Sequence, residues 1–128
     1  MRILILLAFV MFSSVTNAQS LICEGATATI AYGSKSPWGY ESVSFTIKNA
    51  RASVTRQYKY VWFSMACLAN PSGKKLLVYQ AYCSGSSCRD LDNWGIIDPV
   101  SLKFLLEPTD DNSSKAQAIM GSTLKPLK

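Results

Sequence analysis

The fold is decided by residues 54–83, VTRQYKYVWFSMACLANPSGKKLLVYQAYC. Its first part, Val54–Cys67, is the most aromatic stretch of the chain, and as one strand it places Tyr58, Tyr60 and Trp62 on a single face. The opposite face then carries apolar side chains, those of Val61, Phe63, Met65 and Cys67. The pattern therefore predicts one long aromatic strand with two apolar faces.

The rest of this stretch predicts a hairpin. Asn70–Gly73, with the sequence NPSG, is a strong turn signal because each of these residue types favours a turn conformation. Leu76–Cys83 is again apolar and aromatic, as expected for the returning strand.

Alternating residues outside the hairpin extend it to a sheet. Ala26–Tyr32 and residues 42–48 alternate apolar and polar side chains with period two, which predicts strands with one buried face, whereas Gly33–Gly39 has the composition of a loop. Residues 96–105 predict one or two short strands broken at Pro99. We therefore expect an α+β fold, mainly an antiparallel sheet of about five strands, with one short C-terminal helix.

That helix is predicted over Ser113–Met120. The polar residues 110–112 are typical of a helix start, and Gly121 is placed as a C-terminal stop. Ala116, Ile119 and Met120 would share its buried face.

The first residues predict export. Arg2 precedes the apolar run Ile3–Phe12, and the small residues Thr16 and Ala18 follow, which is the order of a secretory signal peptide. The apolar run is half of the about 20 residues that a membrane-spanning helix needs. We interpret residues 1–18 as a cleaved signal peptide and residues 19–128 as a single small domain.

Four cysteines remain after this cleavage, an even number that predicts a disulfide framework in an exported chain. Three pairings are compatible with four cysteines. We prefer Cys83–Cys88, which closes a short flexible loop, together with Cys23–Cys67.

Charge is unevenly distributed. The mature chain has twelve Lys and Arg against eight Asp and Glu; residues 19–89 hold eight cations and two anions, and residues 90–128 hold four cations and six anions. We expect the two parts to attract each other within the fold. The alternative is a basic face that attracts an anionic partner.

The composition excludes several kinds of chemistry. The chain has no histidine, so the commonest general base, the Ser-His-Asp and Cys-His arrangements and the usual zinc ligands are missing. Phosphate-loop and dinucleotide glycine patterns are also missing. We expect no cofactor and no resident metal.

Carboxylates are the remaining groups for acid–base catalysis. Asp90, Asp92 and Asp98 lie close together in the sequence, and a pair of such acids can hydrolyse a glycosidic bond. Asp90, Asp92 and Gly95 also match part of a calcium-binding EF-hand loop, but Ser101 stands where that loop needs a glutamate. A small hydrolase acting on glycan or peptidoglycan through the 90–98 loop is the catalytic alternative.

Basic residues are interleaved with aromatic ones between positions 51 and 62, at Arg51, Arg56, Tyr58, Lys59, Tyr60 and Trp62. These residue types can stack on nucleic-acid bases, but they are also the types that anchor protein interfaces. Because an exported protein rarely meets nucleic acid, we expect a protein partner and no nucleic acid.

Two further features stay open. Trp38 or Trp94 could line a pocket in a ligand carrier, and Asn112-Ser113-Ser114 is a formal glycosylation acceptor.

Cys23-Glu24-Gly25 with the alternating residues up to Tyr32 is similar to the opening of the periplasmic inhibitors of c-type lysozymes, which are small disulfide-linked β-barrel proteins. The motif that carries inhibition in that family is not found further along, so no functional residue is carried over.

From these residues we expect an exported, non-catalytic module that binds another envelope or secreted protein. A bacterial periplasmic inhibitor, an immunity-type protein and an accessory subunit of an envelope machine all fit this description. The expected interface is the face with Arg56, Tyr58, Tyr60 and Trp62.

Overall fold

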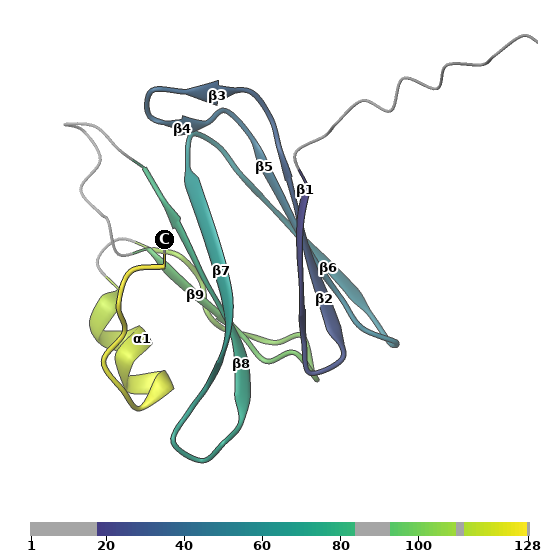
Figure 1. Cartoon of the computed structure of the whole chain (residues 1–128), viewed down its shortest axis with the longest axis vertical. Coiled ribbons are helices and arrows are strands. Elements are labelled where there is room, and N and C mark those ends of the chain that lie inside the picture. The colour runs from purple at the N-terminus through teal and green to yellow at the C-terminus, as the bar shows by residue number, and fades with distance from the viewer. Residues whose placement is uncertain (1–17, 84–92, 110–111, 128) are drawn as a thin grey trace, which may run out of the picture.

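Two antiparallel sheets of four strands face each other in the computed structural model, which describes residues 18–83, 93–109 and 112–127 (Figure 1). The first sheet has the order β1-β2-β5-β6, with bounds Ala18–Cys23, Ala26–Tyr32, Val43–Lys48 and Ser53–Tyr58. The second has the order β10-β9-β8-β7, with bounds Phe104–Leu106, Trp94–Ile97, Lys75–Tyr82 and Trp62–Ala69. A small hairpin, β3 (Lys35–Ser36) and β4 (Gly39–Tyr40), and one helix, α1 (Ser113–Met120), complete the described fold.

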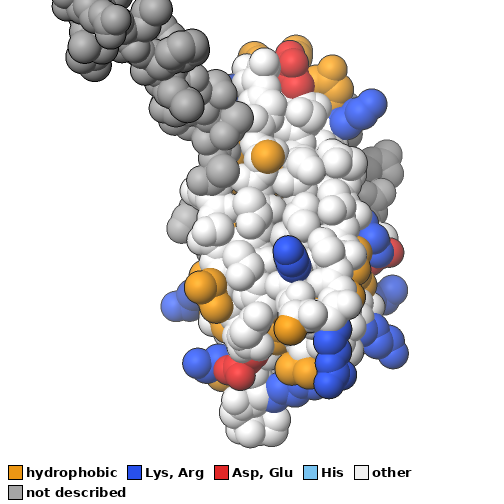
Figure 2. Space-filling model, turned by 90° about the vertical axis from the view of Figure 1, so that its right-hand side faces the viewer, with side chains coloured by type: hydrophobic (Ala, Val, Ile, Leu, Met, Phe, Trp, Pro, Cys, Tyr) orange, Lys and Arg blue, Asp and Glu red, His pale blue; other side chains and the backbone are white. Residues whose placement is uncertain are grey.

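The first sheet follows the period-two pattern. Ala28, Ile30 and Phe45 are buried on its inner face, while the residues between them point outward. The outer face is mostly uncharged in Figure 2, with Lys and Arg gathered toward its lower end. Predicted strands 26–32 and 42–48 are confirmed as β2 and β5. Strand β1 was not predicted, since it lies at the edge of the sheet and exposes Ile22 to solvent.

The aromatic stretch is two strands and not one, which corrects the prediction from the sequence. Strand β6 ends at Tyr58 in the first sheet, and β7 begins at Trp62 in the second sheet. Between them Tyr60 has a φ of 56°, a left-handed backbone conformation that turns the chain from one sheet to the other. In β6 the even-numbered residues face the core, whereas in β7 the odd-numbered residues do. No single face therefore runs through residues 54–67.

The core between the sheets is built on aromatic rings. Phe45 lies 5.1 Å from Phe63 and 4.8 Å from Tyr79, measured between ring centroids. Tyr79 is fully buried, and its hydroxyl lies 2.7 Å from that of Tyr58. Burial raises the pKa of Tyr79 far above its ordinary value. Gly95 makes room for this ring, because a Cβ there would lie 2.1 Å from an atom of Tyr79.

The helix covers the outer face of the second sheet (Figure 1). Ala116 and Met120 are buried against Val78 and Trp94, and Gly121 ends the helix with a φ of 68°. The predicted helix and its stop are therefore confirmed. Helix α1, the helix of the described residues, is too short and too polar to cross a membrane.

The predicted Cys23–Cys67 disulfide is confirmed, and it joins the end of β1 to β7. Cys83 is disulfide-bonded as well, whereas Cys88 lies outside the described residues. The predicted class, mainly antiparallel sheet with one short helix, is also confirmed, but the described residues form ten strands instead of about five. The difference comes from β1, from the β3–β4 hairpin within the expected loop, from the division of the aromatic stretch and from the separation of β9 and β10. The one expected sheet is in fact two four-stranded sheets and the small hairpin.

Candidate functional site

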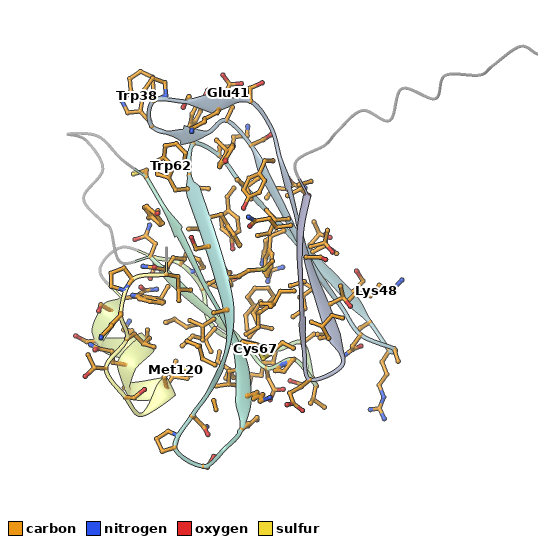
Figure 3. All side chains as sticks on the ribbon, viewed as in Figure 1. Trp38, Glu41, Lys48, Trp62, Cys67 and Met120 are labelled. Atoms are coloured by element: carbon orange, nitrogen blue, oxygen red, sulfur yellow. A yellow bond between two sulfur atoms is a disulfide. The ribbon has the colours of Figure 1, made fainter. Side chains whose placement is uncertain are left out.

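A short hairpin raises Trp38 from one end of the molecule. Strands β3 and β4 are joined by Pro37 and Trp38, and the Ser36 hydroxyl donates to the carbonyl of Gly39 at 2.6 Å while accepting the N–H of Trp38 at 3.3 Å. The Trp38 side chain is 56% exposed at the tip of this turn (Figure 3). The turn is thus held by internal hydrogen bonds while its ring faces solvent.

The hairpin is fixed to the start of β7. The N–H of Tyr40 donates to the carbonyl of Val61 at 2.9 Å, and the N–H of Val61 donates to the carbonyl of Tyr40 at 3.2 Å. Gly39 has a φ of 132°, and a Cβ there would lie 2.7 Å from the backbone of Val61. Only glycine permits this close approach.

Aromatic rings continue from the hairpin onto both sheets. Tyr40 lies 4.3 Å from Tyr32 of β2 and 5.5 Å from Trp62 of β7, measured between ring centroids. The Nζ of Lys35 lies 5.4 Å from the centre of the Trp62 ring, within range of a cation–π interaction. Trp38 and Trp62 occupy the same end of the molecule in Figure 3.

Tyr60 adds a second strongly exposed ring to this end. It lies at the corner between β6 and β7, and its side chain is 53% exposed. We call the five rings at this end of the molecule the aromatic end: Tyr32, Trp38, Tyr40, Tyr60 and Trp62.

The structure separates the four predicted binding residues. Tyr60 and Trp62 belong to the aromatic end, whereas Tyr58 points into the core toward Tyr79. Arg56 donates from Nε to Glu107 at 2.9 Å, and its guanidinium lies 4.2 Å from the centre of the Phe104 ring. The prediction that the four share one face is wrong, because the corner at Tyr60 redirects the chain.

Sequence reasoning did not place Lys35 and Tyr40 at this site and considered Trp38 only as a pocket residue. They lie in a stretch whose glycine, serine and proline residues indicated a loop. Nothing in that composition reveals that the loop folds onto Val61. The only signal was the Trp38-Gly39 pair, in which a large ring precedes a residue that permits close packing.

Of the candidate catalytic acids, Asp98 alone is described, since Asp90 and Asp92 lie outside the described residues. Its carboxylate accepts from the Lys74 ammonium at 2.7 Å and from the N–H of Val100 at 2.9 Å. The Lys74 hydrogen bond lowers the pKa of Asp98 below its ordinary value, although partial burial acts in the opposite direction. A lowered pKa does not suit a general acid, and the bonds to Lys74 and Val100 give Asp98 a structural role in the β9–β10 connection.

The other open features are also placed. Trp94 is buried among Val78, Ala116 and Met120, so it belongs to the packing beneath the helix. Asn112 is 1% exposed, and both ends of its amide are bonded to the backbone. In the folded chain this amide is not accessible for glycosylation.

Among the described residues, two ion pairs join the basic and acidic parts of the chain, which agrees with the expected attraction between them. Arg56 pairs with Glu107, and Lys74 pairs with Asp98. Of the described residues, no group of three or more acidic, cysteine or histidine side chains is arranged to hold a metal ion.

The function of the aromatic end has to follow from its own residues. No family model matches the chain, and no curated protein or solved structure matches it.

Proposed function

We propose that this chain is an exported, non-catalytic module that binds another protein through the aromatic end. The observation that carries the proposal is that Trp38 and Tyr60 stay more than half exposed at the same end of the molecule as the partly buried Trp62. Burying such rings is favourable, and tryptophan and tyrosine are the residues that most often dominate the energy of an interface.

The rigid mounting of these rings supports the same proposal. Trp38 stands on a hairpin that is hydrogen-bonded internally and to Val61, so little conformational entropy remains to be lost on binding. Lys35 is exposed next to Trp62 and adds a positive charge that favours an acidic group on the partner.

The cellular site belongs to the proposal. The order of residues 1–18 and the confirmed Cys23–Cys67 disulfide support export into an oxidising compartment. We propose the bacterial periplasm as that compartment, and an inhibitor, an immunity-type protein or an accessory subunit of an envelope machine as the kind of module.

The test is a pull-down from an envelope extract of the source organism, with the oxidised mature protein as bait and mass spectrometry as the readout. The binding variant carries Trp38→Ala and Tyr60→Ala. The matched control is Ile22→Ala, which removes a 72% exposed apolar side chain beside Thr27, at the other end of β2 from Tyr32.

We expect one stoichiometric protein that the wild type and Ile22→Ala retain and that the double variant loses at least about tenfold, the loss of about 1.4 kcal/mol of binding energy. Circular dichroism confirms that each bait is folded. Equal capture by all three baits would exclude the aromatic end as the interface.

A further inference from the structure

Strand β7 is an edge strand of the second sheet, and it lacks the features that normally protect such a strand. The described residues place no strand beside it on the side away from β8. Its eight residues, WFSMACLA, contain neither a charge nor a proline. Natural edge strands usually carry such residues, or are very short, because an unprotected edge pairs with other chains.

The hydrogen bonds of β8 show which backbone groups of β7 are unpaired. The N–H of Ala81 in β8 donates to Asn93 at 3.0 Å, so the backbone groups of Ala81 point away from β7. Phe63 lies opposite Ala81 in the register. In an antiparallel pair such residues turn their N–H and C=O groups outward, and this direction alternates along the strand. Phe63 and Met65 therefore direct four backbone groups toward the open side.

The stretch of β7 with unpaired backbone groups is limited at both ends. The next outward-facing residue above Phe63 is Val61, and its two groups are bonded to Tyr40. The next one below Met65 is Cys67, which is bridged to Cys23 with 5.5 Å between the two Cα atoms. Val61 is four residue steps from Met65 and six from Cys67, which corresponds to about 14 to 20 Å of strand. A short extended segment fits between these limits.

A groove lies along the same edge. It has a volume of about 470 Å³ and is lined by Gln19 of β1, by residues 63–66 of β7 and by Pro126 and Leu127 of the C-terminal segment. None of the described side chains that line it is charged. The lining thus combines apolar surface with the neutral polar groups of Gln19 and Ser64.

We propose that this groove receives an extended segment of the partner protein, which pairs with β7 at Phe63 and Met65 as an additional strand. The unpaired backbone groups of Phe63 and Met65 select an extended backbone in the partner. The edge is continuous with the aromatic end, since β7 begins at Trp62. This inference rests on the proposed function and specifies how that partner binds.

The first test uses a phage-displayed library of linear dodecapeptides, selected against the oxidised mature protein. The strongest binder is synthesised in three forms: unmodified, and N-methylated at one or the other set of alternate residues across its central segment. In a strand, alternate N–H groups point to opposite sides. We expect one methylated form to lose at least about tenfold in affinity and the other to bind like the unmodified peptide.

Hydrogen exchange gives the second readout. The unmodified peptide should slow exchange of the Phe63 and Met65 amide protons, because each becomes hydrogen-bonded. Failure to select any binder, equal effects of the two methylated forms, or unchanged exchange at both residues would each overturn the proposal.

A variant of the protein tests the hydrogen bond that the Met65 N–H would donate to the peptide. Met65→Pro removes an N–H that points away from β8, so the β7–β8 ladder keeps its hydrogen bonds, as edge positions for proline require. The matched control is Met65→Leu, which changes the side chain and keeps the N–H. We expect Met65→Pro to weaken peptide binding at least about tenfold and Met65→Leu to leave it nearly unchanged. Should Met65→Pro fail to fold, the methylated peptides on wild-type protein decide the question.

The partner from the pull-down separates the two proposals. If the peptide displaces that partner, both proposals are supported. If the partner is lost on Trp38→Ala and Tyr60→Ala but is unaffected by excess peptide, the aromatic end remains the interface and strand addition is wrong.

Discussion

Single side chains hold distant segments of this molecule together. The amide of Asn112 accepts the N–H of Trp94 at 2.8 Å, and it donates to the carbonyl of Trp94 at 2.7 Å and to that of Glu107 at 3.1 Å. It thereby connects β9, the end of β10 and the start of α1 through one buried group. Its position before Ser113 predicts a helix cap, but its side chain makes no capping hydrogen bond.

Asn112→Asp should destabilise the fold strongly. The new carboxylate oxygen would face the carbonyl oxygens of Trp94 and Glu107, with no solvent to reach it. We expect a loss of about 3 kcal/mol in the free energy of unfolding at neutral pH, measured by urea denaturation.

Asn70→Asp is the matched control for that substitution. The Asn70 side-chain oxygen accepts from Ser72 and Lys74 in an exposed turn, and an aspartate keeps this acceptor. Its stability should stay within about 0.5 kcal/mol of the wild type. Similar losses in both variants would show that burial of the Asn112 amide is not the cause.

Tyr60 combines a strained backbone with an exposed ring. Left-handed φ values cost a residue with a side chain about 1 kcal/mol, and glycine adopts them freely. Tyr60→Gly should therefore keep the free energy of unfolding or raise it by up to about 1 kcal/mol, while partner capture falls. A clear loss of thermal stability, measured by calorimetry, would show that the ring serves the fold more than binding.

At the scale of the elements, period-two patterns identified those strands whose two faces differ. Strands β2 and β5 have one apolar and one polar face, and the helix has an apolar side and a terminal glycine. The corner at Tyr60 escaped prediction because no glycine or proline marks the turn and the aromatic alternation of Tyr58, Tyr60 and Trp62 runs through it. The change shows only on the other face, where polar residues at 55, 57 and 59 give way to apolar ones at 61, 63 and 65. The same corner separates Arg56 and Tyr58 in β6 from Trp62 in β7, so the four predicted binding residues do not share one face.

The connection between β9 and β10 is organised by Asp98. Its carboxylate is bonded to Lys74 and to the N–H of Val100, and its backbone bonds with Leu102 and Lys103. Because its pKa is lowered in the folded state, it stabilises the protein above its ordinary pKa of about 4, and this contribution is lost as the pH falls through the folded value.

Asp98→Asn should therefore be less stable than the wild type at pH 7, and the difference should narrow as the pH is lowered below about 4. Urea denaturation at a series of pH values measures this. A difference that stays constant down to pH 2 would mean that the carboxylate charge does not contribute.

At the scale of the whole molecule, the two sheets are joined differently along their two sides. The Cys23–Cys67 disulfide connects β1 with β7, whereas the side of β6 and β10 is held by Arg56 against Glu107 and Phe104. Both partners of that ion pair are partly exposed, so its contribution is small and sensitive to salt.

Replacing both cysteines by alanine should lower the free energy of unfolding by about 2–4 kcal/mol, because the bridge closes a loop over a sequence separation of 44 residues. Urea denaturation of oxidised wild type and of Cys23→Ala/Cys67→Ala measures the change. Coinciding midpoints would mean that the bridge does not restrict the unfolded chain enough to stabilise the fold.

The difference between the two sides also gives the molecule a mechanical asymmetry. Apart from the backbone that runs from β6 into β7 at Tyr60, a force that separates the sheets meets a disulfide on one side and non-covalent contacts on the other. The sheets should therefore part first between β6 and β10 and rotate about the bridged side, as a hinge does. The open groove beside β7 lies next to that axis, where such a rotation displaces the two strands least.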